Sequence, residues 1–479
     1  MTAHAQPTPQ QEAREALGPY ASYRNSGLPW LGTIPAHWDV RRNGRLFAER
    51  VETGFEDLPI LEVSLRTGVR VRDMENGSRK QQMTDRSKYK RAAKGDIAYN
   101  MMRMWQGAVG VAPEDGLISP AYVVARPFPE VDPRYYTYLF RTPAYMREVN
   151  KFSRGIVSDR NRLYWDEFKQ MPSAFPPTEE QIRIADFLDA HGRLTARLIR
   201  NKRRLIGLLN EQKQAIINRA VTRGLNPDAP MKPTGIDWMS EVPAHWDVKP
   251  LKHWLRERAK ALGDKTSPEY EFDYLDISCV GTGFLTAKPE RMKFEDAPSR
   301  ARQIVQKGDT ILSTVRTYLK AVYFIEDEWP DLIASTGFAV LRPVEQVEPR
   351  LLGYVLQSST FVERVIRASI GVAYPAISEG RLGTLHVAFS PDRAEQKAIL
   401  DHIAAETAAF DEAIEKAQSE TTLIREYRER LISDVVAGKL DLRQIEITAP
   451  DDEPGLDEDD APDEDLDAEG AEDLAEAED

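Results

Sequence analysis

The chain has 479 residues, of which 41% are hydrophobic and 29% are charged, and its formal net charge is -13. This length suffices for two or more domains, each with a core of its own. The single cysteine, Cys279, excludes an intrachain disulfide and any metal site built from several cysteines, and it fits a reducing compartment. No segment reaches the roughly 20 apolar residues that span a bilayer, and the first residues lack a secretion signal, so we expect a cytoplasmic protein.

In chain order, residues 1–25 are predicted to be a flexible N-terminus, and the segment after them is repeated later in the chain. SGLPWLGTIPAHWDV at 26–40 matches TGIDWMSEVPAHWDV at 234–248 without a gap. Two further pairs keep the same order: KGDIAYNMMR (94–103) with KGDTILSTVR (307–316), and EEQIRIADFLD (179–189) with AEQKAILDHIA (394–404). This repetition predicts one module of about 210 residues that is used twice.

Each module divides into two parts with different periodicity. Residues 26–177 and 226–392 carry short β-rich runs and helical stretches between Gly, Pro and Asp residues, which predicts two mixed α/β domains. In residues 178–225 and 393–445, Gly and Pro are rare and apolar residues recur at three and four spacing. This pattern predicts two helical spacers.

Both helix starts carry capping signals. Thr178 is placed to cap the first helix with Gln181 reaching back, and Asp392 to cap the second with Glu395 at capping-box spacing. We expect the first helix to break near Gly192, after a short initial segment.

The two helices share a stripe of apolar positions. The positions that are apolar in both copies are Ile199/Ile414, Leu208/Leu423, Leu209/Ile424, Ile216/Leu431, Ile217/Ile432 and Val221/Val436. Such a stripe needs a partner, which predicts a long antiparallel coiled-coil pair that separates the two domains in a pseudo-two-fold arrangement. The alternative is that each helix folds back on its own domain.

The last part of the chain, residues 446–479, is predicted to be an acidic disordered tail. Residues 449–479 contain 17 Asp and Glu and no Lys or Arg, with almost nothing to bury. The simple interpretation is a solvated tail. The alternative is a phosphate mimic that competes for a nucleic-acid groove on its own protein.

Motifs for catalysis are absent from the sequence. It contains no Gly-rich loop followed by Lys and Ser or Thr, and no Asn-Pro-Pro-aromatic segment. His37 and His245 have no Cys, Glu or second His nearby at metal-ligand spacing. We therefore predict structural anchors: Trp38 and Trp246 buried where each α/β domain meets the helices, with His37 and His245 hydrogen-bonded there, and no metal site.

Charge differs between the two modules. Residues 41–177 have a net charge of +7 and residues 178–225 of +5, whereas residues 249–392 are neutral and residues 393–440 carry -3. Basic residues beside small polar and aromatic residues suit contacts with phosphates and with guanine edges. Charge alone is equally compatible with a solvated face.

Three motifs occur twice, in the same order and at the same spacing. They are Gly-x-x-x-x-x-x-[IV]-Pro-x-His-Trp, Lys-Gly-Asp, and a Glu-Gln pair that opens a long helix. This arrangement over residues 26–445 resembles the specificity subunit of type I DNA restriction-modification systems. The resemblance implies two target recognition domains that each read half of a split, asymmetric double-stranded DNA site, with the paired helices as a ruler.

The resemblance also implies partners and a division of labour. The subunit itself is non-catalytic and binds no cofactor. Two methyltransferase (modification) subunits supply S-adenosylmethionine-dependent adenine methylation. Two motor-nuclease (restriction) subunits, which use ATP and Mg, complete the endonuclease complex.

Candidate DNA-contacting residues follow from position. They are Arg103, Arg154, Arg160 and Arg162 in the first domain and Arg316, Arg367 and Tyr374 in the second. The alternative for each is a surface residue without a base contact. At the level of the whole chain, the alternative function is a non-catalytic helical scaffold or adaptor that binds proteins, and a stand-alone nuclease or methyltransferase is disfavoured by the missing motifs.

Overall fold

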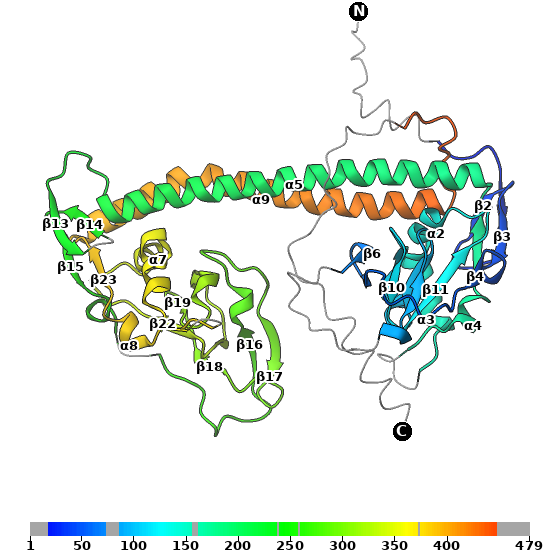
Figure 1. The fold of residues 1–479 in the computed structure, drawn as a ribbon. Coiled ribbons are helices and arrows are strands. Elements are labelled where there is room, and N and C mark those ends of the chain that lie inside the picture. Colours follow the sequence, from blue (N-terminus) through cyan, green and yellow to red (C-terminus); the bar gives the residue numbers. More distant parts are fainter. Residues whose placement is uncertain are drawn as a thin grey trace, which may run out of the picture. The chain divides into compact units, whose positions relative to one another are not determined.

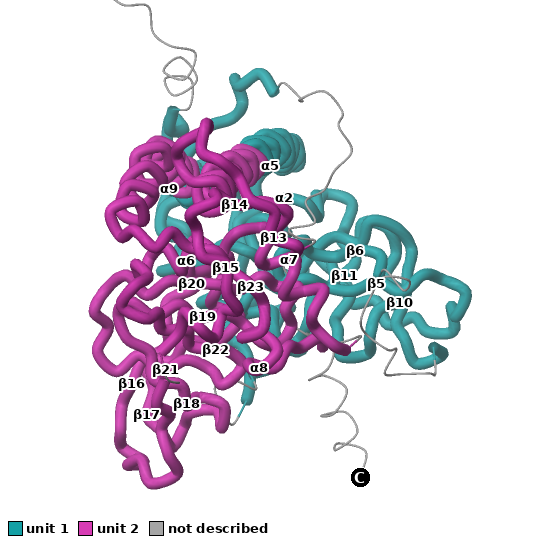
Figure 2. Tube along the Cα trace, turned by 90° about the vertical axis from the view of Figure 1, so that its left-hand side faces the viewer, with its two compact units in different colours: residues 1–202, 419–479 teal, residues 203–418 magenta. Residues whose placement is uncertain are grey.

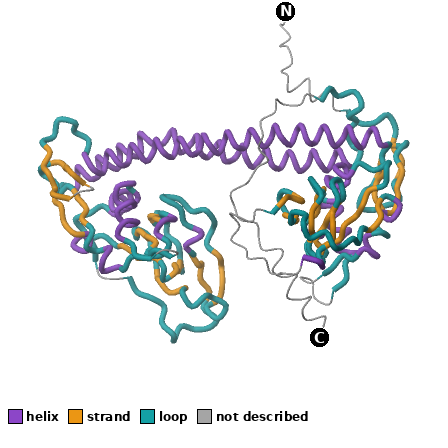
Figure 3. Tube along the Cα trace, viewed as in Figure 1, coloured by secondary structure: helices purple, strands orange, loops and turns teal. Residues whose placement is uncertain are grey.

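The computed structural model describes residues 18–72, 86–155, 161–236, 239–256, 259–371 and 374–447. The chain divides into two compact units, unit 1 with residues 1–202 and 419–479, and unit 2 with residues 203–418 (Figure 2). Each unit contains one mixed α/β domain and part of both long helices (Figures 1 and 3). The predicted fold class is therefore confirmed, while the acidic tail lies outside the described residues from residue 448 onward.

Unit 1 is built around a four-stranded antiparallel sheet in the order β4-β11-β8-β9. Its strands are β1 (Tyr23–Asn25), β2 (Thr33–Pro35), β3 (Asp39–Arg42), β4 (Phe47–Glu49), β5 (Leu61–Ser64), β6 (Gly68–Val71), β7 (Lys90–Ala92), β8 (Ile97–Asn100), β9 (Val109–Val111), β10 (Gly116–Ile118), β11 (Tyr122–Pro127) and β12 (Pro172–Phe175). Its short helices are α2 (Pro133–Phe140), α3 (Pro143–Phe152) and α4 (Trp165–Phe168). The pairs β1-β2, β3-β12, β5-β6 and β7-β10 form separate two-stranded sheets.

Unit 2 repeats this plan with a three-stranded sheet in the order β20-β19-β22 and a second sheet, β17-β16-β21-β18. Its strands are β13 (Met231–Ile236), β14 (Met239–Pro243), β15 (Asp247–Pro250), β16 (Glu271–Leu275), β17 (Glu290–Lys293), β18 (Ala301–Ile304), β19 (Thr310–Ser313), β20 (Val322–Phe324), β21 (Leu332–Ser335), β22 (Phe338–Leu341) and β23 (His386–Phe389). Its short helices are α6 (Pro349–Gln357), α7 (Ser359–Ala368) and α8 (Glu379–Leu382).

The internal repeat is visible in the strand pairing. In both units the strand that follows Lys-Gly-Asp lies between two antiparallel neighbours, as β11-β8-β9 in unit 1 and as β22-β19-β20 in unit 2. In both, the strand after His-Trp pairs with the strand before the long helix, as β3-β12 and β15-β23. The duplicated sequence thus folds into the same arrangement twice.

The long helices are α5 (Thr178–Arg223) and α9 (Arg393–Val436). Within unit 1, Lys202 Nζ lies 2.5 Å from a carboxylate oxygen of Glu420, and Arg183 Nε donates to the carbonyl of Leu442 at 2.6 Å. The earlier residue of α5, Arg183, contacts the later residue, Leu442, and the later residue of α5, Lys202, contacts the earlier one, Glu420. The two segments therefore run antiparallel there. The same holds in unit 2, where Lys213 Nζ lies 2.5 Å from Asp411, and Gly224, just after α5, lies beside Glu395.

Each hydrophobic core receives the start of one long helix and the end of the other. In unit 1, Ile184 and Leu188 of α5 share the core with Leu431 and Val435 of α9. In unit 2, Ile399 and Ile403 of α9 share it with Ile217, Ala220 and Val221 of α5. The alternative in which each helix packs only on its own domain therefore does not hold.

Two expectations about the helices and one about the N-terminus are wrong. Helix α5 continues through Gly192: a helical Gly costs about 1 kcal/mol relative to Ala, and the contact of His191 with Tyr427 of α9, at 5.7 Å between ring centroids, helps to hold the segment in place. Leu208 and Leu423 are 51% and 62% exposed, so this pair does not belong to the buried stripe.

Residues 18–25, which fall within the segment predicted to be flexible, depart from that expectation. Tyr23–Asn25 forms β1 against β2, and Tyr20 is buried. The reason is local packing, because the Tyr20 ring lies 5.9 Å from the ring of Trp38.

Candidate nucleic-acid interface and its anchors

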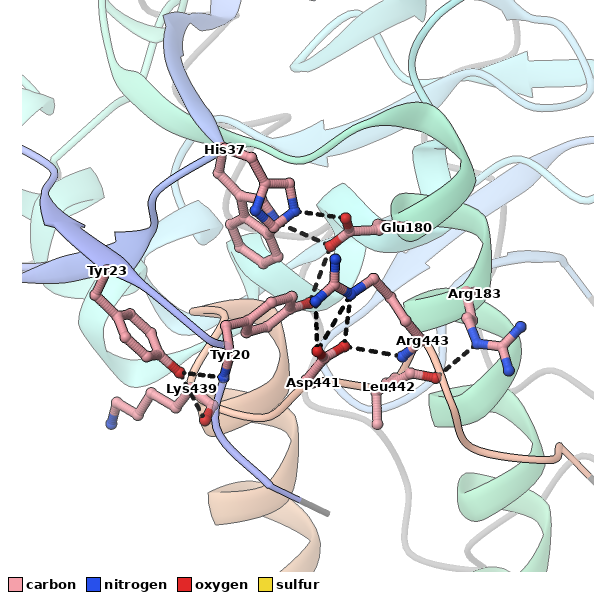
Figure 4. A network of polar contacts seen from close by, with 10 residues as sticks. Tyr20, Tyr23, His37, Glu180, Arg183, Lys439, Asp441, Leu442 and Arg443 are labelled. Carbon is pink, nitrogen blue, oxygen red and sulfur yellow. Dashed lines mark hydrogen bonds and ion pairs between the residues drawn. The ribbon is translucent and has the colours of Figure 1, made fainter. Parts of the chain in front are cut away.

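The first His-Trp motif binds one carboxylate at the start of α5. Trp38 is fully buried and its Nε1 donates to Glu180 Oε2 at 2.9 Å, while His37 Nε2 lies 2.6 Å from Glu180 Oε1. The Tyr20 hydroxyl donates to Glu180 Oε2 at 3.0 Å (Figure 4). Burial and the Glu180 carboxylate hold the pKa of Tyr20 well above its usual value, so the hydroxyl stays a donor.

The second motif binds the start of α9 in the same way. Trp246 is 2% exposed and its Nε1 donates to Glu395 Oε1 at 3.1 Å, and His245 Nε2 lies 2.8 Å from Glu395 Oε2. The hydroxyl of Ser390 also donates to Glu395 Oε2. Burial opposes ionisation of this carboxyl, but the hydrogen bonds from Ser390, His245 and Trp246 hold the pKa of Glu395 below its usual value. Both tryptophans and both histidines thus lie where the sequence predicts anchors.

The end of the other long helix also packs close to each tryptophan. Gly438, just after α9, has a left-handed φ of 73°, and a Cβ there would come within 2.9 Å of Trp38 and 2.4 Å of Pro35. Gly224, just after α5, has a φ of 68°, and a Cβ would lie 3.4 Å from Trp246. A left-handed glycine after a helix is a common C-terminal cap, and here it also lets the helix end approach the ring.

In unit 1 the segment after α9 closes over the anchor. The Asp441 N–H donates to the carbonyl of Gly18 at 2.8 Å, and the Tyr23 hydroxyl donates to the carbonyl of Lys439 at 3.2 Å. The guanidinium of Arg443 lies 5.1 Å from the centre of the Tyr20 ring (Figure 4). Segments from both ends of the described chain therefore hold the first anchor together.

The glutamine after each anchoring glutamate serves a different contact. Gln181 Oε1 accepts from the Asp132 N–H at 2.9 Å, just before α2, and Gln396 Oε1 accepts from the Glu348 N–H at 2.8 Å, just before α6. The capping box expected for Gln181 is wrong, because its side-chain oxygen accepts from the residue that precedes α2 instead of reaching back to the start of α5. Asp392 does cap α9, accepting from the Ala394 N–H at 2.9 Å.

The sequence patterns do not predict that the two glutamates accept hydrogen bonds from the His-Trp motifs. The pattern places Glu395 in a helix cap, but its carboxylate is taken by the His-Trp motif, and it assigns no role to Glu180. A signal is nevertheless present, because Glu180 and Glu395 occupy the same place in the repeat, one residue before the shared glutamine.

The Lys-Gly-Asp segments are structural turns. Asp96 is 2% exposed and accepts from Arg50 Nε at 2.6 Å, and Asp309 is 1% exposed and accepts from Arg342 Nε at 2.7 Å. Each aspartate also accepts a backbone N–H from the turn, from Ala93 in the first copy. These buried ion pairs fix the entry of β8 and β19, at whose other ends the candidate interfaces lie.

In the first domain, the turn after β8 lies beside a hairpin loop. Arg103 precedes a short 3-10 helix, Met104–Gln106, and its guanidinium donates to Gln106 Oε1 at 3.1 Å. The Leu163 N–H, at the end of the hairpin loop, donates to the carbonyl of Met101 at 2.9 Å. This bond fixes the loop next to the turn.

That hairpin loop brings two of the predicted arginines together. The backbone groups of Arg154 and Arg162 pair across it, with N–H to carbonyl distances of 2.9 and 2.8 Å. The Arg154 side chain is 76% exposed and lies 2.7 Å from Glu167 of α4. Arg160 lies outside the described residues.

The second domain has the equivalent pair of loops. Arg316, after β19, has a left-handed φ of 50°, and its guanidinium lies 5.1 Å from the centre of the Tyr374 ring. The Ile377 N–H donates to the carbonyl of Thr314 at 2.8 Å, which corresponds to the bond from Leu163 in the first domain. Arg316 and Tyr374 are thus brought together, whereas Arg367 is an exposed residue near the end of α7, outside these two loops.

Other kinds of site have no support among the described residues. They contain no group of three or more His, Cys, Asp or Glu side chains that could hold a metal ion. In the same part of the chain, no helix has the length and apolar character that crossing a membrane requires.

The comparisons with known proteins agree with the predicted resemblance. No protein-family model matches the sequence. The chain is 28% identical over 163 residues to the type I restriction enzyme HindI specificity subunit of Haemophilus influenzae, a match that covers 32% of this chain. It spans 35% of that relative's length, so about a third of the relative is matched. The resemblance to type I specificity subunits is thereby confirmed.

Solved structures also align with the chain. One, from a study of complex assembly and conformational transition of the type I R-M system, has a TM-score of 0.56 at 15% identity, over 85% of this chain and 99% of that one, and it shares the fold. The HsdS subunit from Thermoanaerobacter tengcongensis aligns with a TM-score of 0.38 at 17% identity, over 85% of this chain and 98% of that one.

Proposed function

We propose that the chain is the DNA sequence-specificity subunit of a type I restriction-modification complex. The observation that carries this proposal is the duplication: two α/β domains of one plan, each with a turn and a hairpin loop at the same place, each held by a His-Trp motif. Two equivalent readers in one chain suit a split, asymmetric DNA site whose halves are read separately. The match to a type I specificity subunit supports the same assignment.

We assign residues 26–177 and 226–392 as the two target recognition domains and residues 178–225 and 393–445 as the helical spacers. The reading surface of each domain is the loop pair beside the central sheet. It contains Arg103, Arg154 and Arg162 in the first domain and Arg316 and Tyr374 in the second. Arg160 and Arg367 complete the candidate set.

In this proposal the chain is non-catalytic and directs partner subunits. Two modification subunits bind S-adenosylmethionine and methylate adenine, and two restriction subunits use ATP and Mg to cut. Exposed apolar side chains on the long helices offer surfaces for such partners: Leu194, Leu198, Leu205 and Leu208 on α5 and Leu423 and Tyr427 on α9.

The decisive experiment is methylome sequencing of the host with and without this gene. We expect a split adenine-methylated motif that disappears on deletion and returns when the wild-type gene is restored. If no such motif disappears although the protein is expressed and still binds other proteins, the adaptor function replaces the DNA-reading one.

A matched pair of variants tests the loop assignment. Arg154→Ala should alter or weaken recognition of one half-site, whereas Arg45→Ala, which removes an exposed arginine from another turn of the same domain, should leave the motif unchanged. Equal effects of the two variants would contradict the assignment of the loop pair.

A further inference from the structure

The second α/β domain exposes its large apolar side chains in one region. Among the described residues of 226–392, the exposed large hydrophobic side chains are Phe284, Tyr318, Leu319, Ile370 and Tyr374, with exposed fractions between 44% and 70%. They belong to three loops, whose described residues are 281–285, 314–320, and 369–371 with 374–377. Everywhere else in the described part of this domain, large apolar side chains are at least partly covered.

Hydrogen bonds connect the three loops to one another, and we call their exposed apolar side chains the apolar face. The Gly283 N–H donates to the carbonyl of Val322 at 2.8 Å, and the Thr282 hydroxyl donates to the carbonyl of Lys320 at 2.7 Å. On the other side, Val315 pairs with Ala376 across a β-bridge. The loop at 314–320 therefore lies between the other two.

The central loop is held in an uncommon conformation. Arg316 and Lys320 both have left-handed backbone, with φ of 50° and 54°, and they bracket the 3-10 turn Thr317–Leu319. Left-handed conformations are rare for residues with a Cβ and concentrate at functional sites. The turn between them presents Tyr318 and Leu319 to solvent, at 49% and 44% exposure.

Charge distinguishes the apolar face from the rest of its domain. Residues 249–392 have equal numbers of basic and acidic residues, yet the three loops contain Arg316 and Lys320 and no Asp or Glu. Glu211 and Glu363 lie beside Phe284, where they line a pocket with it and with Lys320, so the positive charge belongs to the loops themselves. Loops that carry exposed apolar side chains and only positive charge fit DNA, where phosphates lie on either side of a groove whose floor carries the apolar thymine methyl groups.

We propose that Tyr318 and Leu319 contact base edges in the major groove of the second half-site, thymine methyl groups above all. Ile370 and Tyr374 extend the contact, and Arg316 and Lys320 bind the flanking phosphates. The second domain then reads its half of the site mainly through apolar contacts. This inference rests on the proposed function, since it assigns the reading mode of a domain that binds DNA.

The first test uses the full chain with its modification subunits in the host. Tyr318→Ser and Leu319→Ala remove exposed apolar groups, and Val51→Ser removes a 64% exposed one from the other domain as a matched control. We expect both loop variants to relax one half of the methylated motif and to leave the other half unchanged. Tyr318→Phe keeps the ring and should retain the wild-type motif, as should Val51→Ser.

The second test uses a duplex carrying the motif that the wild-type chain methylates, with thymine replaced by deoxyuridine in the second half-site. Loss of one buried methyl group should weaken binding of the wild-type complex by about 4-fold. The same replacement should have no effect on the Leu319→Ala complex if Leu319 makes the contact, and no effect in the first half-site.

The outcomes separate this inference from the proposed function. If the wild-type chain yields no split motif, the proposed function fails and this inference fails with it. If the wild-type motif exists and neither Tyr318→Ser nor Leu319→Ala changes it, only the apolar reading is overturned. Loss of modification-subunit binding, and with it of all methylation, in a variant chain that still binds the duplex with wild-type affinity would also overturn it, because the apolar face would then be a protein interface.

Discussion

The two units share the same anchor between the α/β domain and the long helices, but their loops beside the central sheet differ. In both, a buried tryptophan and a histidine share one glutamate at the start of a long helix, and a left-handed glycine ends the other helix against the ring. The loops beside the central sheet differ, since the first domain carries the paired Arg154 and Arg162 and the second carries the apolar face. The module therefore separates the residues that hold the fold from those that we propose to contact DNA.

The two anchors also differ, both in the hydrogen-bond donors of the glutamate and in their exposure. Glu180 accepts from Tyr20 in the N-terminal segment, and the segment after α9 packs over that contact, whereas Glu395 accepts from Ser390 in its own entry loop. The first anchor is also more enclosed, because the His37 side chain is 39% exposed and that of His245 51%. This difference predicts that the first anchor is the more sensitive one.

The largest expected effect is the loss of an anchoring ring. Trp38→Ala should lower the free energy of unfolding of unit 1 by about 3–5 kcal/mol, because it leaves a cavity where the helix ends meet the domain. Hydrogen exchange should then rise throughout unit 1. Trp246→Ala should do the same in unit 2, and a variant whose exchange rises only in the opposite unit would contradict this view of the anchors.

Removing the shared carboxylate should come next. Glu180→Ala leaves the donors of Tyr20, His37 and Trp38 without an acceptor, at about 1–3 kcal/mol for each buried donor that stays unsatisfied. Glu395→Ala should cost less, since its site is more open to water. Chemical denaturation measures the loss of unfolding free energy in each variant, with the exposed Glu179→Ala as control. Equal losses for Glu180→Ala and Glu395→Ala would contradict the predicted difference between the two anchors.

The interface variants should have smaller, selective effects. If Arg154 binds a phosphate, Arg154→Ala should reduce the slope of log affinity against log salt by about 1, and if it reads a base, it should cost about 1–3 kcal/mol at one position of the site. Leu319→Ala should leave that slope unchanged, because it removes no charge. Measuring DNA binding by the full-length variants over a range of salt concentrations distinguishes a phosphate contact from a base contact. A lower slope for Leu319→Ala would contradict the proposed apolar contact with the bases.

The smallest expected effect is a pH dependence at the second anchor. The folded-state pKa of Glu395 is lowered, so its contribution to stability is complete above the unfolded-state pKa, near 4.5, and is lost as the pH falls through the folded-state value. Glu395→Gln should therefore flatten the acid side of the stability profile of unit 2. The exposed Glu406→Gln serves as control, and a profile that Glu395→Gln leaves unchanged would contradict this role of the carboxylate.

The internal repeat makes much of the fold predictable from residue patterns. Matched segments indicate two modules, and the isolated histidines beside Trp and Pro indicate structural anchors, which is how Trp38 and Trp246 are used. The apolar stripe indicates an antiparallel helix pair, although Leu208 and Leu423 are exposed. Periodicity marks the apolar residues on a helix, but it does not say which of them a partner segment covers.

The sequence by itself determined the duplication, the two α/β domains and the burial of the motif, because these depend on local pattern and on the repeat. Only the tertiary structure decided what the motif binds, how the N-terminal segment and the segment after α9 close unit 1, and that three loops form one apolar face. The reason is distance along the chain: the Arg443 guanidinium lies over the Tyr20 ring, and the Thr282 hydroxyl donates to the carbonyl of Lys320. Contacts of this kind arise from folding and leave no local signal in the residues that make them.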